Sequence, residues 1–445
     1  MASAQFCAAL RQSRRCARLE LHSSLLSSQL SPQCRFTSTT AVPNTEPPAQ
    51  SSESTVQEKE KTKITRRLTK PKRMTYGRVI EGMESGPLSK QSKVQLPHMD
   101  TWRKVFHMTK DVGKRVSLRN PDTAKMLAES FVPEGSRDKV VIEASPGPGQ
   151  LTRALLDLPK ERIKKLIVLE PVSQYLEYLK PLENIDERVK VLPLPGHSWS
   201  SYTKLLEMGL LSDVEKTDWS QVHPHLTFIM TMAPFVDGEQ LAAQLLRTVP
   251  ERQWLQQYGR VPMHFILTGR MWERMKAPPS SMPRCKVSVM AQAAAEMYEA
   301  IPYDFLQPYS DHFHPDRHNT YELKYGDLDL RRLGIPLTSA SFIPLEHPKI
   351  ETGDLDIWDY CVRKLFVQKA TPLEKCITAL GPGATNLLPK LDDPDKPEDK
   401  VDLKKTPRGL DMEEWSRVVR VFKSWPFRPE DLGIGTLFNP HQHNR

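Results

Sequence analysis

The sequence predicts an α/β fold in which helices alternate with the strands of a parallel sheet, followed by a smaller helical domain. Short apolar segments predict strands at 139–144, 163–169, 189–192, 226–230 and 263–267. Segments with helical periodicity lie between several of them, at 172–181, 201–208 and 238–248. Such alternation is typical of a parallel sheet with helical crossovers. We therefore expect an α/β domain over 99–280.

The first predicted strand leads directly into a glycine turn. The sequence S-P-G-P-G at 145–149 follows strand 139–144, and an apolar helical stretch begins after it. Strand, glycine turn and helix form the opening unit of a Rossmann-like, doubly wound sheet. Gly147 and Gly149 would let the backbone approach a ligand, and the N-terminus of the helix would offer it free N–H groups.

An acidic residue follows the second predicted strand, 163–169. Glu170 stands where a carboxylate can accept hydrogen bonds from both ribose hydroxyls of a nucleoside. A glycine turn alone is weak support for a ligand site, because it can also close such a sheet without a ligand. Glu170 favours a nucleoside pocket. A phosphate-binding P-loop is excluded, since the sequence contains no G-x-x-x-x-G-K-[ST].

Amphipathic helices are predicted in the second half of the chain. Segments 290–300 and 355–380 have apolar residues at helical spacing, and we expect a helical domain over 281–388 with a cleft between it and the sheet. Alternating charge and several prolines predict a linker at 389–410. A terminal helix at 412–422 begins the last segment, 411–445, and docks either on its own core or on a partner.

The first 98 residues are predicted to hold a targeting segment and a linker. Residues 1–40 contain five arginines, eight serines and one acid, Glu20. This is the composition of a mitochondrial transit peptide, with a disordered basic tail as the alternative, and we expect delivery to the mitochondrial matrix. Residues 41–98 are polar and predicted to be disordered. Their basic cluster at 66–73 is either a solvated linker or an arm that contacts nucleic acid.

The overall charge is basic, with 63 Lys and Arg against 54 Asp and Glu, a net charge of +9. Such an excess indicates a polyanionic partner without identifying it. No C-x-x-C pair is present, and the histidines at 312, 314 and 318 lie in a proline-broken segment, so no metal is expected. The sequence also lacks an apolar run of about 18 residues, so no membrane-spanning helix is expected.

Three sequence motifs resemble those of one enzyme family. The run V-I-E-A-S-P-G-P-G-Q-L-T at 141–152 resembles motif I of the ribosomal RNA adenine dimethyltransferases, which bind S-adenosylmethionine. R-V-S-L-R-N-P at 115–121 and L-F-V-Q-K-A-T-P-L at 365–373 are similar to two further motifs, although only motif I is highly specific. The resemblance implies a Rossmann-like S-adenosylmethionine-dependent methyltransferase sheet. It also implies cofactor contacts at Leu118, Glu143, Ser145, Gly147, Gly149, Glu170 and His197.

Three residues depart from the family pattern. Ser145 replaces the first glycine of motif I, and His197 stands where an aspartate holds the adenine amino group of the cofactor. Met232, in T-M-A-P-F, replaces the asparagine of the catalytic N-L-P-[FY], while Pro234 and Phe235 remain. Methionine offers only a weak acceptor, and a neutral histidine cannot replace a carboxylate as an acceptor for an exocyclic amine. No catalytic site is therefore intact, and we expect methyl transfer to be very weak or absent.

These departures resemble the fungal mitochondrial transcription-factor branch of the family. The resemblance implies a protein that assists the mitochondrial RNA polymerase at promoters by stabilising melted DNA, in which Phe235 stacks on unpaired bases. Candidate phosphate contacts, each also explicable as a solvated charge, are Arg115, Arg119, Lys364 and Lys369. Two alternatives stay open: an active adenine N6-dimethyltransferase of mitochondrial small-subunit rRNA, and an rRNA-binding assembly scaffold. The sequence leaves open whether S-adenosylmethionine still binds.

Overall fold

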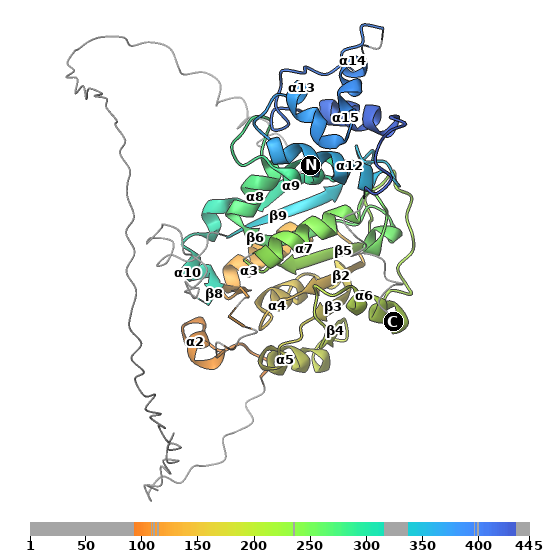
Figure 1. Ribbon diagram of the computed structural model, residues 1–445. Coiled ribbons are helices and arrows are strands. Elements are labelled where there is room, and N and C mark those ends of the chain that lie inside the picture. The colour runs from red at the N-terminus through yellow and green to blue at the C-terminus, as the bar shows by residue number, and fades with distance from the viewer. Residues whose placement is uncertain are drawn as a thin grey trace, which may run out of the picture. The chain divides into compact units, whose positions relative to one another are not determined.

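The computed structural model describes residues 93–432, apart from 108, 110, 111, 114, 235, 316–336, 396, 398 and 399. They belong to one compact unit, Glu84–Arg445. Figure 1 shows a central sheet with helices packed against it and a group of helices beyond one edge. The predicted transit peptide and the linker up to residue 92 lie outside the described residues. Among the described residues, no helix is long and apolar enough to cross a membrane.

The central sheet has seven strands. Their spatial order is β4 (Val189–Leu192), β3 (Ile163–Leu169), β2 (Lys139–Ala144), β5 (Leu226–Thr231), β6 (Met263–Thr268), β9 (Leu337–Pro344) and β7 (Ala295–Ile301). Neighbours from β4 to β6 are parallel, whereas β9 is antiparallel to both β6 and β7. The five parallel strands reverse direction of progression at β2, as in doubly wound nucleotide-binding sheets. The predicted Rossmann-like α/β fold is therefore confirmed.

Helices cover both faces of the sheet because its inner strands are apolar on both sides. Val140 and Ile142 of β2 pack in one core with α6 (Trp199–Glu207), α7 (Val236–Arg247) and α8 (Gly269–Lys276). Val141 faces the other core. That core contains side chains of α3 (Pro121–Phe131), α4 (Gln150–Leu156) and α5 (Ser173–Leu179). Burial on both faces explains why these strands read as continuous apolar runs in the sequence.

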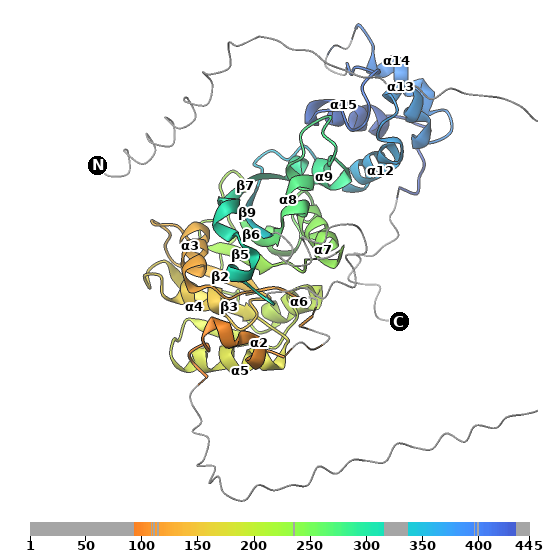
Figure 2. The same cartoon turned by 90° about the vertical axis from the view of Figure 1, so that its left-hand side faces the viewer.

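The helical part has a core of its own. It is formed by α9 (Lys286–Ala294), α12 (Leu355–Leu365), α13 (Leu373–Cys376), α14 (Leu388–Leu391) and α15 (Met412–Lys423). Both views place these helices beyond α8, on the β9 side of the sheet (Figure 1, Figure 2). Trp415 of α15 stacks on Phe366, with ring centroids 5.7 Å apart. The terminal helix therefore docks on the core of its own chain.

Short elements complete the described fold. The 3-10 turns are η2 (Met99–Thr101), η3 (Lys180–Asn184), η4 (Trp254–Tyr258), η5 (Tyr303–Leu306), η7 (Phe366–Gln368), η8 (Ile377–Leu380) and η9 (Ala384–Leu387). The short helices are α2 (Trp102–Val105) and α10 (Tyr309–His312). A separate pair of strands, β1 (Ser117–Leu118) and β8 (Phe313–His314), joins the chain before the sheet to the chain after α10. This pair fixes the segment that borders the candidate site.

The structure differs from the sequence expectation in the second half of the chain. Segment 281–388 is not purely helical, because it contains β7 and β9. The helix expected over 290–300 ends at Ala294, where the chain turns into β7 and pairs with β9. Segment 389–410 is not a loose linker either. Val401 and Leu410 are buried in the helical core, and Leu373 N–H donates to Lys405 O at 2.8 Å.

We predict that Phe342→Ala destabilises the protein strongly. The ring of Phe342, in β9, is fully buried and lies 5.0 Å from the ring of Phe265, so its loss should lower the free energy of unfolding by about 3 to 5 kcal/mol. Urea unfolding followed by circular dichroism measures the change. The matched control is Phe427→Ala, whose ring is 76% exposed and should change stability by less than about 0.5 kcal/mol. Equal effects of the two substitutions would contradict the placement of β9.

Candidate functional site

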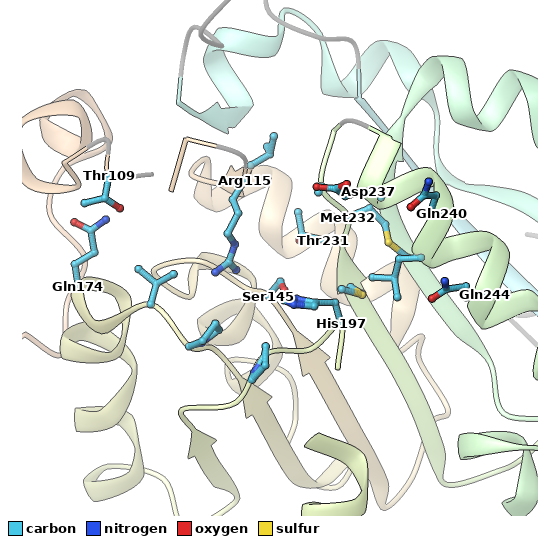
Figure 3. A pocket seen from close by; sticks show the side chains of 18 of the residues that line it. Thr109, Arg115, Ser145, Gln174, His197, Thr231, Met232, Asp237, Gln240 and Gln244 are labelled. Carbon is cyan, nitrogen blue, oxygen red and sulfur yellow. The ribbon is translucent and has the colours of Figure 1, made fainter. Parts of the chain in front are cut away.

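A cavity of about 940 Å³ lies at the carboxyl ends of the parallel strands. Its walls come from the segment before β1, the glycine turn after β2, the loops after β3 and β4, the end of β5, and α7. In doubly wound sheets, ligands bind at this edge, where the strand order reverses. The structure brings together Arg115, Ser145, His197 and Met232 as wall residues of this cavity (Figure 3).

The glycine turn is held in a left-handed conformation. Ser145, Gly147 and Gly149 have φ angles of +59°, +69° and +91°, and only glycine adopts this region at little cost. A Cβ atom on Gly147 would lie 2.0 Å from Ser117 Oγ, and one on Gly149 would lie 2.3 Å from a methyl group of Leu179. The close approach that requires these glycines is therefore made by the protein itself, whereas the sequence suggested a ligand.

Glu170 lies behind the cavity wall with its carboxylate fully buried. The Arg115 guanidinium makes a bidentate ion pair with this carboxylate, with Nη1 2.5 Å from Oε1 and Nη2 2.6 Å from Oε2. Gly147 N–H donates to Oε2 at 3.1 Å, and Val172 N–H donates to Oε1 at 3.0 Å. The carboxylate thus accepts four hydrogen bonds from this chain. Sequence reasoning had placed Arg115 against DNA, and it did not foresee this pairing.

Glu143 occupies the floor of the glycine turn without facing the cavity. Its Oε2 accepts a hydrogen bond from the Thr152 hydroxyl at 2.6 Å, and its Oε1 has no hydrogen-bond partner within the described part of the chain. Burial raises the pKa of the Glu143 carboxyl to about 8, although the Thr152 hydroxyl works in the opposite direction. At neutral pH this residue therefore holds the turn mainly as a neutral carboxylic acid.

The position of the family's catalytic asparagine is apolar. Met232 is 1% exposed and lines the cavity, and its N–H donates to Ile266 O at 2.8 Å. Pro234 is buried, and Phe235 lies outside the described residues. His197 is exposed at the cavity rim. A thioether is only a weak hydrogen-bond acceptor, so Met232 cannot hold the N–H groups of an amine as an amide oxygen does.

Three polar residues of α7 also face the cavity, and sequence reasoning did not single them out. Asp237, Gln240 and Gln244 lie along one wall, opposite Thr109 and Gln174 (Figure 3). Their spacing of three and four residues puts them on one face of the helix. This spacing, in the helix that directly follows the T-M-A-P-F sequence, is the signal that could have identified them.

The remaining predicted site residues lie elsewhere. Leu118, in β1, is buried in the core shared with α3 and α4. Arg119 donates to the backbone carbonyls of Met99 and Ser310, so its guanidinium ties two segments together. Lys364 lies over the ring of Tyr360, at 5.4 Å from its centroid, and Lys369 is exposed. Contact of these residues with DNA stays a prediction.

The residues present do not fit S-adenosylmethionine in this arrangement. Both oxygens of Glu170, which should accept the ribose hydroxyls, are already engaged by Arg115 and by backbone N–H groups. His197 supplies no carboxylate in place of the aspartate that the resemblance predicts at the adenine of the cofactor. Among the described residues, no group of three or more His, Cys, Asp or Glu side chains is arranged to hold a metal ion.

We predict that Glu143 makes stability depend on pH. Its folded-state pKa of about 8 lies above the ordinary pKa of 4.5, so the native state holds a proton that the unfolded state releases between these values. Stability contributed by this group falls as pH rises, by up to about 1.4 kcal/mol per pH unit. Glu143→Gln should therefore gain stability relative to wild type from pH 5.5 to 7.5. Urea midpoints measure it, and parallel pH curves would refute the assignment.

Comparisons with known proteins show what this chain is similar to. The model of the ribosomal RNA adenine dimethylase family matches residues 116–315. Mitochondrial transcription factor 1 of Lachancea kluyveri is 25% identical over 293 residues, which cover 65% of this chain and 82% of that protein. Mitochondrial dimethyladenosine transferase 1 of Vermamoeba vermiformis is 21% identical over 326 residues, covering 66% and 84%.

A solved structure of a dimethyladenosine transferase from Plasmodium falciparum aligns with 69% of this chain and 97% of its own, at 13% identity and a TM-score of 0.47. The motif I residues and the doubly wound sheet of this chain both lie inside the segment that the family model matches. The central region of this chain is therefore similar to the ribosomal RNA adenine dimethylase family, and fungal mitochondrial transcription factors are among the proteins that it resembles.

Proposed function

We propose that this chain is a mitochondrial transcription initiation factor built on a dimethylase scaffold that has lost its chemistry. The observation that carries the proposal is Met232. It lines the cavity at the position where the resemblance predicts a catalytic asparagine, and its thioether is only a weak acceptor for the N–H groups of a target amine. Several relatives bear the name mitochondrial transcription factor 1, which supports the same conclusion.

The loss of polar groups affects one site at several points. Met232 removes the grip on the target amine, His197 removes an acceptor for the adenine of a cofactor, and Ser145 replaces a glycine of the turn. Residues that act as a unit lose function far more steeply than a single contact would suggest. A protein that only binds nucleic acid tolerates all three changes.

The cavity wall suits an unpaired strand. Phe235 follows Pro234 in the T-M-A-P-F sequence, and an aromatic ring stacks on any base without regard to sequence. A second hollow of about 500 Å³ continues along α7 and shares Gln240 and Gln244 with the first. Its walls carry three cationic side chains and two carboxylates: Arg247, Arg274, Lys286, Glu239 and Asp359. These cations are paired with the carboxylates, Arg274 with Glu239 and both Arg247 and Lys286 with Asp359, so the charge of this hollow does not itself indicate a ligand.

In the proposed role, the chain binds the mitochondrial RNA polymerase at a promoter and stabilises the melted DNA strand. The relatives are named as mitochondrial proteins. The Arg-rich, Ser-rich segment 1–40 has the composition of a transit peptide, which supports residence in the mitochondrial matrix. Contacts of Lys364 and Lys369 with DNA phosphates belong to the same proposal.

We predict that promoter-specific transcription by purified mitochondrial RNA polymerase requires this protein. On a linear duplex promoter, run-off product should rise at least about tenfold when the protein is added, because the energy of one or two good stacking contacts has this magnitude. On a template with a pre-melted start site, the stimulation should shrink, since the strands are already open. Equal product with and without the protein on the duplex would contradict the proposal.

A second function is favoured by other relatives. Several matching proteins are named dimethyladenosine transferase 1, mitochondrial, and this chain keeps Glu143, Pro234 and Phe235 of the family motifs. An enzyme that methylates adenine N6 of mitochondrial small-subunit rRNA would need to tolerate Met232 at the target amine.

We predict that the protein transfers no methyl group from S-adenosylmethionine to small-subunit rRNA above the level of a Gly147→Arg control. Arginine at this position would clash with Ser117, because a Cβ alone would already lie 2.0 Å from its Oγ atom. Incorporation of labelled methyl groups is the measurement. Labelled N6-dimethyladenine formed by wild type and absent from the control would establish the enzyme function instead.

A further inference from the structure

We propose that Arg115 closes the ribose position of the 940 Å³ cavity against ribonucleoside ligands, and that removing this one side chain reopens it. The inference concerns the cavity alone and does not rest on a role in transcription.

The hydrogen-bond capacity of the Glu170 carboxylate is fully used by this chain. A carboxylate offers about four lone-pair sites, and Glu170 accepts four hydrogen bonds from this chain. Two come from the guanidinium of Arg115 and two from the N–H groups of Gly147 and Val172. No acceptor site is left for a ribose. A diol that entered the cavity would have to displace one of these donors.

The Arg115 guanidinium is anchored from several sides. Fork-to-fork pairs between arginine and carboxylate are among the strongest hydrogen-bonded pairs, because both bonds are charge-assisted. The guanidinium also lies over the ring of Tyr175, 5.7 Å from its centroid. Its own side chain is 16% exposed, so water screens the pair only weakly. A neutral ribose hydroxyl replaces such a donor at a net loss.

The whole segment that carries Arg115 is attached to the rest of the fold by buried side chains and hydrogen bonds. Trp102 and Phe106 form an aromatic cluster with Tyr175 and are fully buried. Val94 O accepts two hydrogen bonds from the Arg153 guanidinium, at 3.1 and 2.7 Å. These contacts fix the segment against α4 and α5 on either side of Glu170. Arg115 is thus held over the carboxylate by the fold.

Removal of Arg115 should leave a space beside Glu170 with free acceptor sites. Its side chain extends into the cavity between Gln174 and Met232 (Figure 3). Without it, Glu170 keeps only the two backbone donors, which leaves two acceptor sites directed to the vacated space. Two is the number that the 2′ and 3′ hydroxyls of a ribose require. The ligand class that this subsite then takes is a ribonucleoside, bound through its two ribose hydroxyls.

The test is calorimetric titration of the full chain with S-adenosylhomocysteine, which binds without reacting. Wild type should give no saturable heat up to about 1 mM, and Arg115→Ser should bind at least about tenfold more tightly than that limit. The matched control is Arg119→Ser, the same substitution four residues along, whose side chain does not line the cavity. This control should behave like wild type.

Methylguanidinium provides a second measurement on the same variant. Methylguanidinium can occupy the position of the lost side chain, so it should weaken the binding of S-adenosylhomocysteine to Arg115→Ser. The titration of wild type, which shows no saturable heat, should not change. Arg115→Gln, which keeps one donor for Glu170, repeats the titration if the serine variant does not fold. Saturable binding by wild type overturns the proposal. Binding absent from every folded Arg115 variant overturns it as well, because the closure would then not depend on this residue.

Discussion

The buried carboxylate of Glu170 is the interaction on which the rest of the site depends. It receives donors from the segment before β1, from the glycine turn after β2, and from the loop after β3. Removing one partner of a buried ion pair typically costs about 3 to 5 kcal/mol, because the remaining charge is left without compensation. One side chain therefore links the three segments that border the cavity.

The fold could be predicted where the chain is apolar on both faces. All five parallel strands lie where their apolar runs predict them, because burial on two sides leaves an uninterrupted signal. β7 was missed for a physical reason. Its sequence continues an alanine-rich stretch with high helix propensity, and only pairing with β9, far along the chain, turns it into a strand. Propensity is local, whereas this pairing is not.

The position of the site could be predicted from the sequence, but the contacts that its residues make could not. Motif I and Glu170 located the cavity, since both lie at the carboxyl ends of neighbouring strands. The partner of Glu170 was not predictable, because Arg115 lies 55 positions away and no periodicity connects the two. The glycines were read as space for a ligand, and Ser117 and Leu179 fill that space. Sequence motifs record which residue types remain, and they do not record what these residues contact.

Retention of Glu170 is consequently no sign of a retained ligand. In a nucleoside-binding protein, such a carboxylate accepts hydrogen bonds from the ribose hydroxyls of the ligand. The surrounding loops are then fully ordered only when the ligand is present. Here the Arg115 guanidinium supplies the missing donors, so the walls of the cavity are ordered by the chain itself. A protein that presents these walls to a nucleic acid gains from this arrangement, because it does not have to spend binding energy on ordering its own loops. In the proposed arrangement, the same Arg115 side chain that closes the subsite to a ribose also preorganises the surface that remains.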